Sequence, residues 1–261
     1  MMIRTMGAAL KPGVVAGDAG RPAVSDAVRT DLAPTGRLRG GMNLSNTLFT
    51  RRTPTGELYG VSVDLMRELA ARLGVEAEFV VWQTPGEVAD LAGANAWDVA
   101  VLAIEQARAK TIAFSPPMTE IEATYAVHGD SPLRAAEQVD APGVRIVAAN
   151  KAGYELYLTR TIRHATLLRP DGFGVAMDVF NGRQGDALAA LRPALIESMA
   201  KLPGARIVDG NFMTVNHGIG MPAGRTAGAA FVAAFVADVV ASGFIARSIE
   251  RHGIQGLAAI R

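Results

Sequence analysis

"GELYGVSVDLMRELAARLGVEAEFVVW", residues 56–82, decides the fold class, because a helical pattern passes directly into a strand pattern. The helical period predicts a helix over residues 62–73 that ends at Gly74. Its apolar side chains share one stripe: Leu65, Met66, Leu69, Ala70 and Leu73. A strand is expected next, over residues 75–82. A helix with one apolar stripe joined to a strand is typical of a helix packed on a sheet.

The same alternation of strands and helices continues on both sides of this stretch. Further strands are expected over residues 38–42, 98–103, 144–149, 166–168, 186–190 and 206–208. Further helices are expected from Pro85, over residues 152–163, up to Asn181-Gly182, over residues 193–201 and over residues 226–242. Such alternation predicts the α/β class with parallel strands.

Two doubly wound α/β lobes account for this order with the fewest assumptions. Extended segments near residues 125–129 and 215–222 are expected to join them. We therefore expect one lobe to contain residues 34–127 and 222–261, and the second lobe to contain residues 128–221.

The N-terminal region, residues 1–33, is rich in Gly, Ala and Pro. We expect it to form a loosely held arm that ends in a short helix over residues 25–32. The longest apolar run in its first thirty residues, Met6 to Leu10, is shorter than the central region of a signal peptide. A cytoplasmic location is therefore one expectation. No run of about twenty apolar residues occurs elsewhere, so no integral membrane segment is expected.

The composition argues against several classes of function. Lys and Arg number 26 and Asp and Glu 25, so the net charge of +1 gives no reason to expect nucleic acid as a partner. Without cysteine there is no disulfide framework and no thiolate metal site. The four histidines, at 128, 164, 217 and 252, lie at least 35 residues apart, so no metal site is expected. No phosphate loop or hydrolase motif occurs, and "GIGMPAG" at residues 218–224 has the wrong spacing for a dinucleotide turn, so no cofactor is expected.

Arg108 is the residue whose position most directly indicates binding. It follows the strand expected over residues 98–103, and open α/β folds bind ligands beyond the carboxyl ends of parallel strands. A guanidinium there offers a planar set of donors that matches a carboxylate with two hydrogen bonds. On the residue pattern alone, a surface arginine on a short helix is an equal alternative.

Four stretches carry a resemblance to a known family: residues 56–82, "WDVAVLAIEQARAKTIAFSPPM" at 97–118, "GDSPL" at 129–133 and "GVRIVAANKAGYELYL" at 143–158. Together the chain resembles the type 3 bacterial extracellular solute-binding proteins, the periplasmic amino-acid-binding components of ABC importers. The resemblance implies a periplasmic binding protein-like, type II fold, with two lobes joined by two crossing strands and a ligand trapped when the lobes close. It also implies that Arg108 grips the ligand's α-carboxylate.

The sequence departs from the family pattern at several positions where the resemblance implies ligand contacts. The loop before Arg108 is shorter than usual and has Ala103 where the family has Ser or Thr, so hydroxyl contacts to the carboxylate are missing there. At the start of the second lobe's first helix, Asn150 and Lys151 stand where a Gly-Thr or Gly-Ser pair is usual. Lys151 is either a charged ligand contact or a solvated residue at a helix start.

A third departure concerns the partner of the ligand's ammonium. The family usually places an Asp after the strand expected here over residues 186–190, and this sequence has Leu191-Arg192-Pro193 there. If Arg192 faces the cleft, the resemblance implies an acid with two separated anionic groups, or one without an α-amino group. Glu122 is the remaining candidate for an ammonium contact; the alternative is a hydrogen bond within the hinge.

Asn46 and Phe49 lie in the loop after the first expected strand, where the family commonly supplies an aromatic wall for the ligand. Phe49 is the candidate for that wall and Asn46 for a polar contact. The alternatives are core packing for Phe49 and a turn for Asn46.

The resemblance therefore implies a solute-binding protein that captures a small carboxylate-bearing metabolite, an amino acid or related organic acid. The expected partners are that ligand and an ABC transporter permease, and the expected protein is a periplasmic monomer. Two alternatives stay open: an enzyme of cyclohexadienyl-dehydratase type on the same fold, and a cytosolic ligand-sensing protein. The non-enzymatic interpretation is preferred, because Glu122 is the one general-acid candidate that the sequence places near the cleft.

Overall fold

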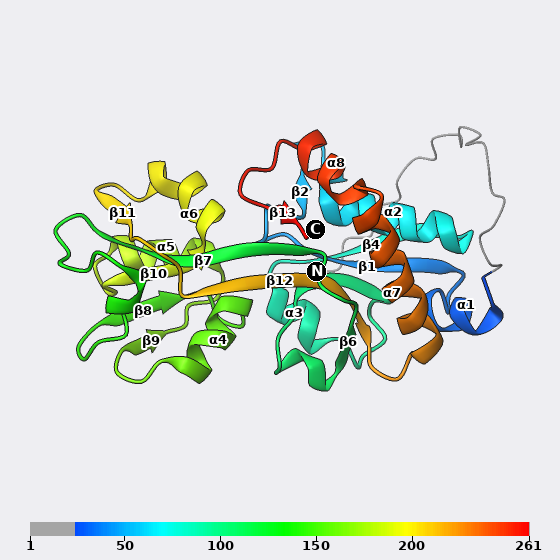
Figure 1. The fold of residues 1–261 in the computed structure, drawn as a ribbon, viewed down its shortest axis with the longest axis horizontal. Coiled ribbons are helices and arrows are strands. Elements are labelled where there is room, and N and C mark those ends of the chain that lie inside the picture. The colour runs from blue at the N-terminus through cyan, green and yellow to red at the C-terminus, as the bar shows by residue number, and fades with distance from the viewer. Residues whose placement is uncertain (1–23, 261) are drawn as a thin grey trace.

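The computed structural model describes residues 24–260, whose helices and strands form two groups joined by two long strands (Figure 1). The joining strands are β7 (Thr119–His128) and β12 (Met213–Pro222). They pair with each other in antiparallel fashion, from His217 opposite Thr119 to Met213 opposite Ala123. We call the group formed by the elements before β7 and after β12 lobe 1, and the group between these strands lobe 2.

The helices and strands of each lobe have the following bounds. Lobe 1 contains α1 (Asp26–Leu32), β1 (Arg37–Asn43), β2 (Arg51–Arg52), β3 (Leu58–Tyr59), α2 (Val61–Leu73), β4 (Glu76–Trp82), α3 (Pro85–Asp90), β5 (Val99–Ala103), η1 (Arg108–Lys110), β6 (Ile112–Phe114), α7 (Thr226–Ala241), α8 (Phe244–Arg251) and β13 (Ala258–Ala259). Lobe 2 contains η2 (Ala136–Gln138), β8 (Arg145–Ala148), α4 (Gly153–Thr161), β9 (Thr166–Leu168), α5 (Phe173–Asn181), β10 (Ala187–Leu191), α6 (Arg192–Ser198), η3 (Met199–Lys201) and β11 (Ala205–Ile207).

One sheet runs through both lobes in the strand order β4-β1-β5-β12-β7-β10-β8-β9. Within the lobes, β1 pairs in parallel with β4 and β5, and β8 pairs in parallel with β9 and β10, as the alternation of elements predicts. The two joining strands differ, because β12 is antiparallel to β5 and β7 is antiparallel to β10. Each joining strand therefore belongs to lobe 1 at one end and to lobe 2 at the other.

The helix and strand predicted from residues 56–82 are confirmed as α2 and β4. The apolar stripe of α2 packs on the sheet, and Leu65, Met66 and Leu69 are fully buried there. Gly74 ends the helix in the left-handed region, with a φ of 69°, and its N–H donates to the carbonyls of the last turn. A glycine suits this position, because other residues pay a steric penalty in that region.

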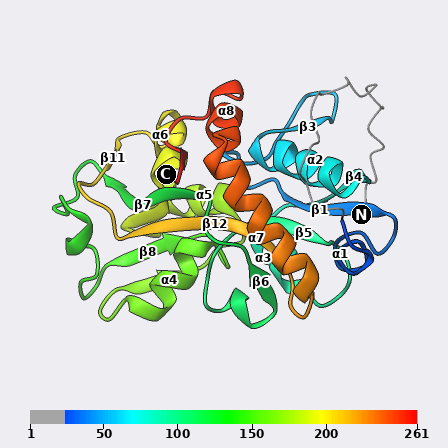
Figure 2. The ribbon, with the colours of Figure 1, turned by 45° about the vertical axis from the view of Figure 1, so that its right-hand side comes forward.

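Helix α1 confirms the short helix predicted over residues 25–32, but it packs against α7 and is not loosely held (Figure 2). Val28 and Leu32 are buried in the lobe 1 core, and Asp31 Oδ2 accepts a hydrogen bond from the Gly228 N–H at 2.9 Å. Ser25 Oγ caps the helix by accepting from the Val28 N–H at 3.3 Å. The apolar spacing of Val28 and Leu32, one helical turn apart, gives α1 a face to bury. Residues 1–23 lie outside the described residues.

Helix α8 has no counterpart among the predicted elements. It is short, and one of its three buried residues, Ile245, Ser248 and Ile249, is a serine. The sequence therefore lacks a clear apolar stripe there. In the described part of the chain, no single helix is long and apolar enough to cross a membrane; α7 and α8 meet that test only together, and they are bent by 67° relative to each other.

Candidate functional site

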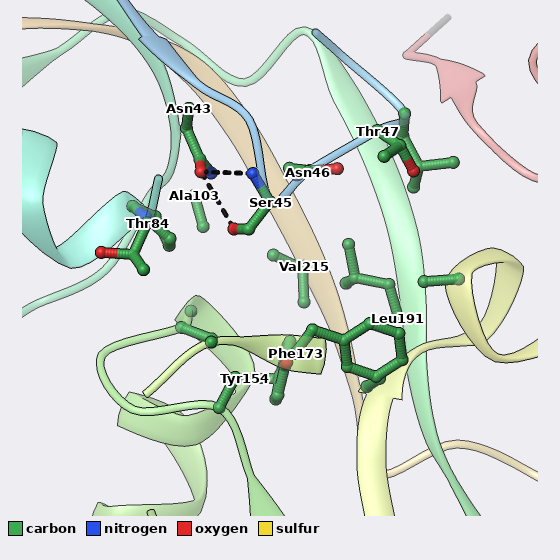
Figure 3. A pocket seen from close by; sticks show the side chains of 18 of the residues that line it. Asn43, Ser45, Asn46, Thr47, Thr84, Ala103, Tyr154, Phe173, Leu191 and Val215 are labelled. Carbon is green, nitrogen blue, oxygen red and sulfur yellow. Dashed lines mark hydrogen bonds between the residues drawn. The ribbon is translucent and has the colours of Figure 1, made fainter. Parts of the chain in front are cut away.

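A cavity of about 280 Å³ lies between the lobes, and residues of both lobes and of β12 line it (Figure 3). On the lobe 1 side, the polar lining residues Asn43, Ser45, Asn46, Thr47, Thr84 and Arg108 occur together with the apolar residues Leu48, Pro85, Val101, Leu102 and Ala103, and β12 adds Val215 and His217. The lobe 2 side is mostly apolar, with Tyr154, Phe173, Met177, Ala190, Leu191 and Ala194, and it adds Asn150, Glu197, Ser198 and Lys201 as polar members. We call the lobe 1 surface the polar side, because more of the polar lining residues belong to it, and the lobe 2 surface the apolar side.

The loop after β1 supplies much of the polar side. Asn43 ends this strand, and its Oδ1 accepts hydrogen bonds from the Ser45 N–H at 3.0 Å and from Ser45 Oγ at 2.9 Å (Figure 3). The Asn46 carbonyl accepts from the N–H groups of Phe49 and Thr50, which closes a turn. Asn46 lines the cavity while its backbone makes this turn, so both interpretations of the residue fit the structure.

Phe49 lies outside the cavity lining and is buried in the lobe 1 core. Its ring contacts the imidazole of His217, with the ring centroids 4.6 Å apart. Phe49 thus lies behind His217, between this cavity residue and the lobe 1 core, and does not itself form a wall of the cavity.

Arg108 lines the cavity and is almost completely buried. Its Nη1 donates to the Ala103 carbonyl at 3.1 Å, and its Nη2 donates to the Lys151 carbonyl at 2.9 Å. Burial lowers the pKa of Arg108 to about 10, so the guanidinium stays charged at neutral pH. Ala103 belongs to lobe 1 and Lys151 to lobe 2, so one arginine side chain joins the two lobes beside the cavity.

His217 is a cavity residue that the sequence patterns did not identify as a binding residue. It lies on β12 opposite Ala103, the same residue whose carbonyl binds Arg108. Its Nδ1 is buried without a hydrogen-bond partner among residues 24–260. Burial, with a smaller effect from the Arg108 charge, lowers the pKa of His217 to about 3. The alternation of Val215, His217 and Ile219, all buried, was the signal that could have placed this side chain on an inner face.

The apolar side of the cavity comes from the helices and strand ends of lobe 2. Leu191, the last residue of β10, is buried in the lining, and Phe173 and Met177 join it from α5. Burial raises the pKa of Tyr154 well above its ordinary value, so its hydroxyl stays protonated. In Figure 3, Tyr154, Phe173 and Leu191 face the Asn43, Ser45 and Thr84 side across the cavity.

Asn150 lines the cavity, whereas its neighbour Lys151 does not. The Asn150 Nδ2 donates to Asp171 Oδ1 at 3.0 Å. The Lys151 ammonium instead reaches out of lobe 2 to Asp90 of lobe 1, with Nζ and Oδ2 2.5 Å apart. A second ion pair crosses between the lobes from Arg160 to Glu105. Charged groups around the cavity thus hold the lobes together.

Glu122 and Arg192 also lie outside the cavity lining, where they pair with each other. The Arg192 Nε donates to Glu122 Oε2 at 2.6 Å, and a guanidinium nitrogen also donates to the Gly210 carbonyl. On β7 the side chains alternate, which puts Glu122 on the exposed face of the strand. Neither residue is placed to meet an enclosed ligand, and Leu191, directly before Arg192, reaches the cavity in its place.

A family model described as "Bacterial extracellular solute-binding proteins, family 3" matches residues 38–255. Among similar solved structures is the P235GK mutant of ArgBP from T. maritima, with 23% sequence identity, 86% of this chain and 98% of that chain covered, and a TM-score of 0.73. A second is the solute receptor for L-cysteine of Neisseria gonorrhoeae, with 17% identity, coverage of 87% and 93%, and a TM-score of 0.74. These likenesses confirm the predicted periplasmic binding protein-like, type II fold.

A third similar structure is that of a protein related to an enzyme. It is the ancestral amino acid-binding protein AncCDT-1, described as a precursor of cyclohexadienyl dehydratase, with 21% identity, coverage of 87% of this chain and 99% of that chain, and a TM-score of 0.71. Binding proteins and a precursor of an enzyme therefore share this fold. The fold does not decide between binding and catalysis, and the residues of the cavity have to be considered.

Proposed function

Since the chain belongs to the bacterial extracellular solute-binding proteins, family 3, we propose that its cavity captures a small carboxylate-bearing metabolite and that Arg108 binds the carboxylate. The observation that carries the proposal is a buried, charged guanidinium in the lining of a cavity between the lobes. A buried charge is costly unless an opposite charge accompanies it.

The charges around the cavity favour an anion. The two hydrogen bonds that Arg108 makes go to neutral carbonyls, and they use two of its five N–H donors. The nearby carboxylate of Glu105 is bound to Arg160. Among the described lining residues, the other charged side chains are Glu197 and Lys201, which are exposed. A ligand carboxylate would therefore find its strongest partner in Arg108.

Capture by closure of the lobes follows from the joining strands and from the contacts across the cleft. β7 and β12 are the main-chain connections between the lobes among the described residues, so bending there changes the distance between the lobes. The contacts of Arg108 with the Lys151 carbonyl, of Lys151 with Asp90 and of Arg160 with Glu105 all form across the cleft. In this proposal the closed protein delivers its ligand in the periplasm, as a monomer, to an ABC transporter permease.

Binding is preferred to catalysis because the cavity lacks a well-placed acid. An elimination requires a general acid at the reacting atoms, and the predicted candidate, Glu122, is paired with Arg192 outside the lining. Glu197 does line the cavity, but it is exposed to solvent. The inferred role is therefore that of a binding protein and not of a dehydratase.

The experiment compares wild-type protein with Arg108→Gln by thermal shift and calorimetry against small carboxylates. The panel contains amino acids, 2-hydroxy acids, 2-oxo acids, dicarboxylates and aromatic acids. A ligand that binds only the folded state raises the melting temperature. We expect Arg108→Gln to weaken binding about 100-fold, since it removes charge-assisted hydrogen bonds to the carboxylate.

Arg192→Gln is the matched control, because it removes the same charge outside the cavity. We expect wild-type affinity from this variant, as its pair with Glu122 is partly exposed and contributes little. The proposal fails if folded Arg108→Gln protein binds the same acid with unchanged affinity, or if no acid of the panel binds the wild-type protein.

A further inference from the structure

We propose that His217 is a specificity-determining residue whose imidazole hydrogen-bonds a neutral oxygen next to the ligand's carboxylate, so that the cavity selects 2-hydroxy or 2-oxo acids over amino acids. The inference rests on the proposed function, because it takes the carboxylate at Arg108 as its starting point. It goes further by naming the class of ligand and a second recognition group.

The geometry brings Arg108 and His217 to one point at the end of β5. Arg108 donates to the Ala103 carbonyl, and Ala103 is the register partner of His217 on β12. Both side chains line the same cavity. A ligand that binds Arg108 through its carboxylate therefore has its next atoms in the neighbourhood of the imidazole.

A ligand could supply the hydrogen-bond partner that the His217 imidazole lacks. His217 is 4% exposed, and its Nδ1 has no hydrogen-bond partner among the described residues. An unsatisfied buried polar atom destabilises the folded state. Since the His217 side chain lines the cavity, a ligand oxygen or hydroxyl could pair with the imidazole from that side. Because the histidine lies on a strand that joins the lobes, this contact would form at the hinge of the closed protein.

The imidazole is neutral in this environment. Its neighbours include Phe49 from the loop after β1, the register partners Ala103 and Thr119, and the charged Arg108 from η1. Of these, Arg108 is the one charged group, and it opposes protonation of His217. The Val215 backbone favours the protonated ring, but burial outweighs this effect. A neutral imidazole has one donor and one acceptor, so it can pair with a hydroxyl or with a carbonyl oxygen.

An ammonium group finds a poor environment at the same place. A buried ammonium needs a carboxylate or several acceptors around it. Leu191 occupies the lining at the end of β10 and offers no acceptor. The one carboxylate among the described lining residues, Glu197, is exposed on α6. A neutral substituent does not need such a partner.

The experiment uses matched acids that differ only at the second carbon. Each series contains the amino acid, the 2-hydroxy acid, the 2-oxo acid and the unsubstituted acid on one carbon skeleton: three-carbon, 4-methylpentanoate and 3-phenylpropanoate. Calorimetry measures the affinity of wild-type, His217→Phe and His217→Gln protein. We expect wild-type protein to prefer the hydroxy or oxo acid of a series at least tenfold over the amino acid.

The variants separate a hydrogen bond from packing. His217→Phe should lose about tenfold affinity for the hydroxy and oxo acids and keep wild-type affinity for the unsubstituted acid. His217→Gln, which retains a donor and an acceptor, should restore part of the loss. In ¹⁵N-histidine NMR spectra, one His217 ring nitrogen should shift when the preferred acid is added, with the ring staying neutral.

Three results would overturn the inference. A preference for the amino acid in each series, with binding still dependent on Arg108, leaves the proposed function standing and refutes the choice of ligand. Equal losses by His217→Phe for substituted and unsubstituted acids show a packing role only. If no acid binds the wild-type protein, the proposed function fails, and this inference fails with it.

Discussion

At the scale of single residues, the site depends on two buried groups, Arg108 and His217, that both lie beside Ala103, the last residue of β5. Arg108 stays charged because its pKa, although lowered by burial, remains near 10, and His217 stays neutral because burial and the Arg108 charge lower its pKa to about 3. One group is thus suited to an anion and the other to a neutral polar partner. The two titrations are separated by several pH units, so neutral solutions contain one protonation state of the pair.

The lowered pKa of His217 predicts an acid-sensitive stability. In the unfolded chain the imidazole takes up its proton near pH 6.5, whereas the folded protein takes it up only near pH 3. The contribution of His217 is therefore fully present above pH 6.5 and falls by about 1.4 kcal/mol for each pH unit below it. Between pH 7 and pH 5, wild-type protein should lose about 2 kcal/mol more unfolding free energy than His217→Gln.

Urea unfolding of both proteins at pH 7, 6 and 5 measures this difference. His252→Gln is the comparison variant, because the His252 imidazole lies outside the cavity lining and is paired with Asp64. Parallel stability curves for wild-type and His217→Gln protein would show that the imidazole is already accessible to protons in the folded state.

At the scale of elements, α1 is a part of lobe 1 and contributes to its core. Leu32 is fully buried, and a Cβ on Gly228 of α7 would come within 2.9 Å of the Leu32 side chain, so the two helices are in close contact. Arg29 Nη1 also donates to the Leu73 carbonyl at 2.5 Å and ties α1 to the end of α2. The helix thus covers α7 on one side of the lobe.

Leu32→Ala should lower the unfolding free energy by about 3 kcal/mol, because it removes a fully buried side chain and leaves a cavity between α1 and α7. Thr30→Ala, an exposed substitution in the same helix, should change it by less than about 0.5 kcal/mol. Urea unfolding measures both values. Equal stability of the two variants would show that α1 is not part of the cooperative unit.

At the scale of the whole molecule, the two lobes touch closely at the start of α4. A Cβ added to Gly153 of lobe 2 would lie 2.6 Å from the Cβ of Ala103 in lobe 1, which is nearer than real contacts allow. Glycine at this position therefore permits the closed arrangement. The same contact lies beside the cavity, since both residues line it.

Gly153→Ala should therefore hold the lobes apart and weaken ligand binding at least tenfold, with little change in stability, because the clash arises only on closure. Small-angle X-ray scattering with and without ligand measures closure, and calorimetry measures affinity. Gly174→Ala is the control, since nothing lies within 4 Å of a Cβ added there. Normal closure of the Gly153→Ala protein would refute the steric role of this contact.

The regular elements were largely predictable because their causes lie close together in the sequence. The apolar stripe of α2, the left-handed glycine that ends it and the capping box at Thr84 all act within a few residues. Elements without such local signals were missed: α8 has a serine in its buried face, and β6 is three residues long. α1 was placed correctly, but its packing on α7 depends on residues almost two hundred positions away.

Half of the predicted site residues line the cavity, and their position in the order of strands was enough to predict this. Asn46, Ala103, Arg108 and Asn150 all follow or end a strand at the cleft, and strand order alone places them there. The other four, Phe49, Glu122, Lys151 and Arg192, were placed near the cleft, and the structure directs their side chains elsewhere. The direction of a side chain depends on the partners available to it in the folded protein, and these partners are often distant in the sequence.

The sequence by itself determined the α/β class, the alternation of elements and the arginine beyond a buried strand, because periodicity and chain order are properties of neighbouring residues. Only the tertiary structure decided which groups face the ligand. Lys151 pairs with Asp90 across 61 positions and Arg192 with Glu122 across 70, so both leave the cavity. His217 enters it because β12 pairs with β5, more than a hundred residues earlier in the chain. Such pairings depend on the closed fold as a whole, in which burial and charge select partners that no local pattern specifies.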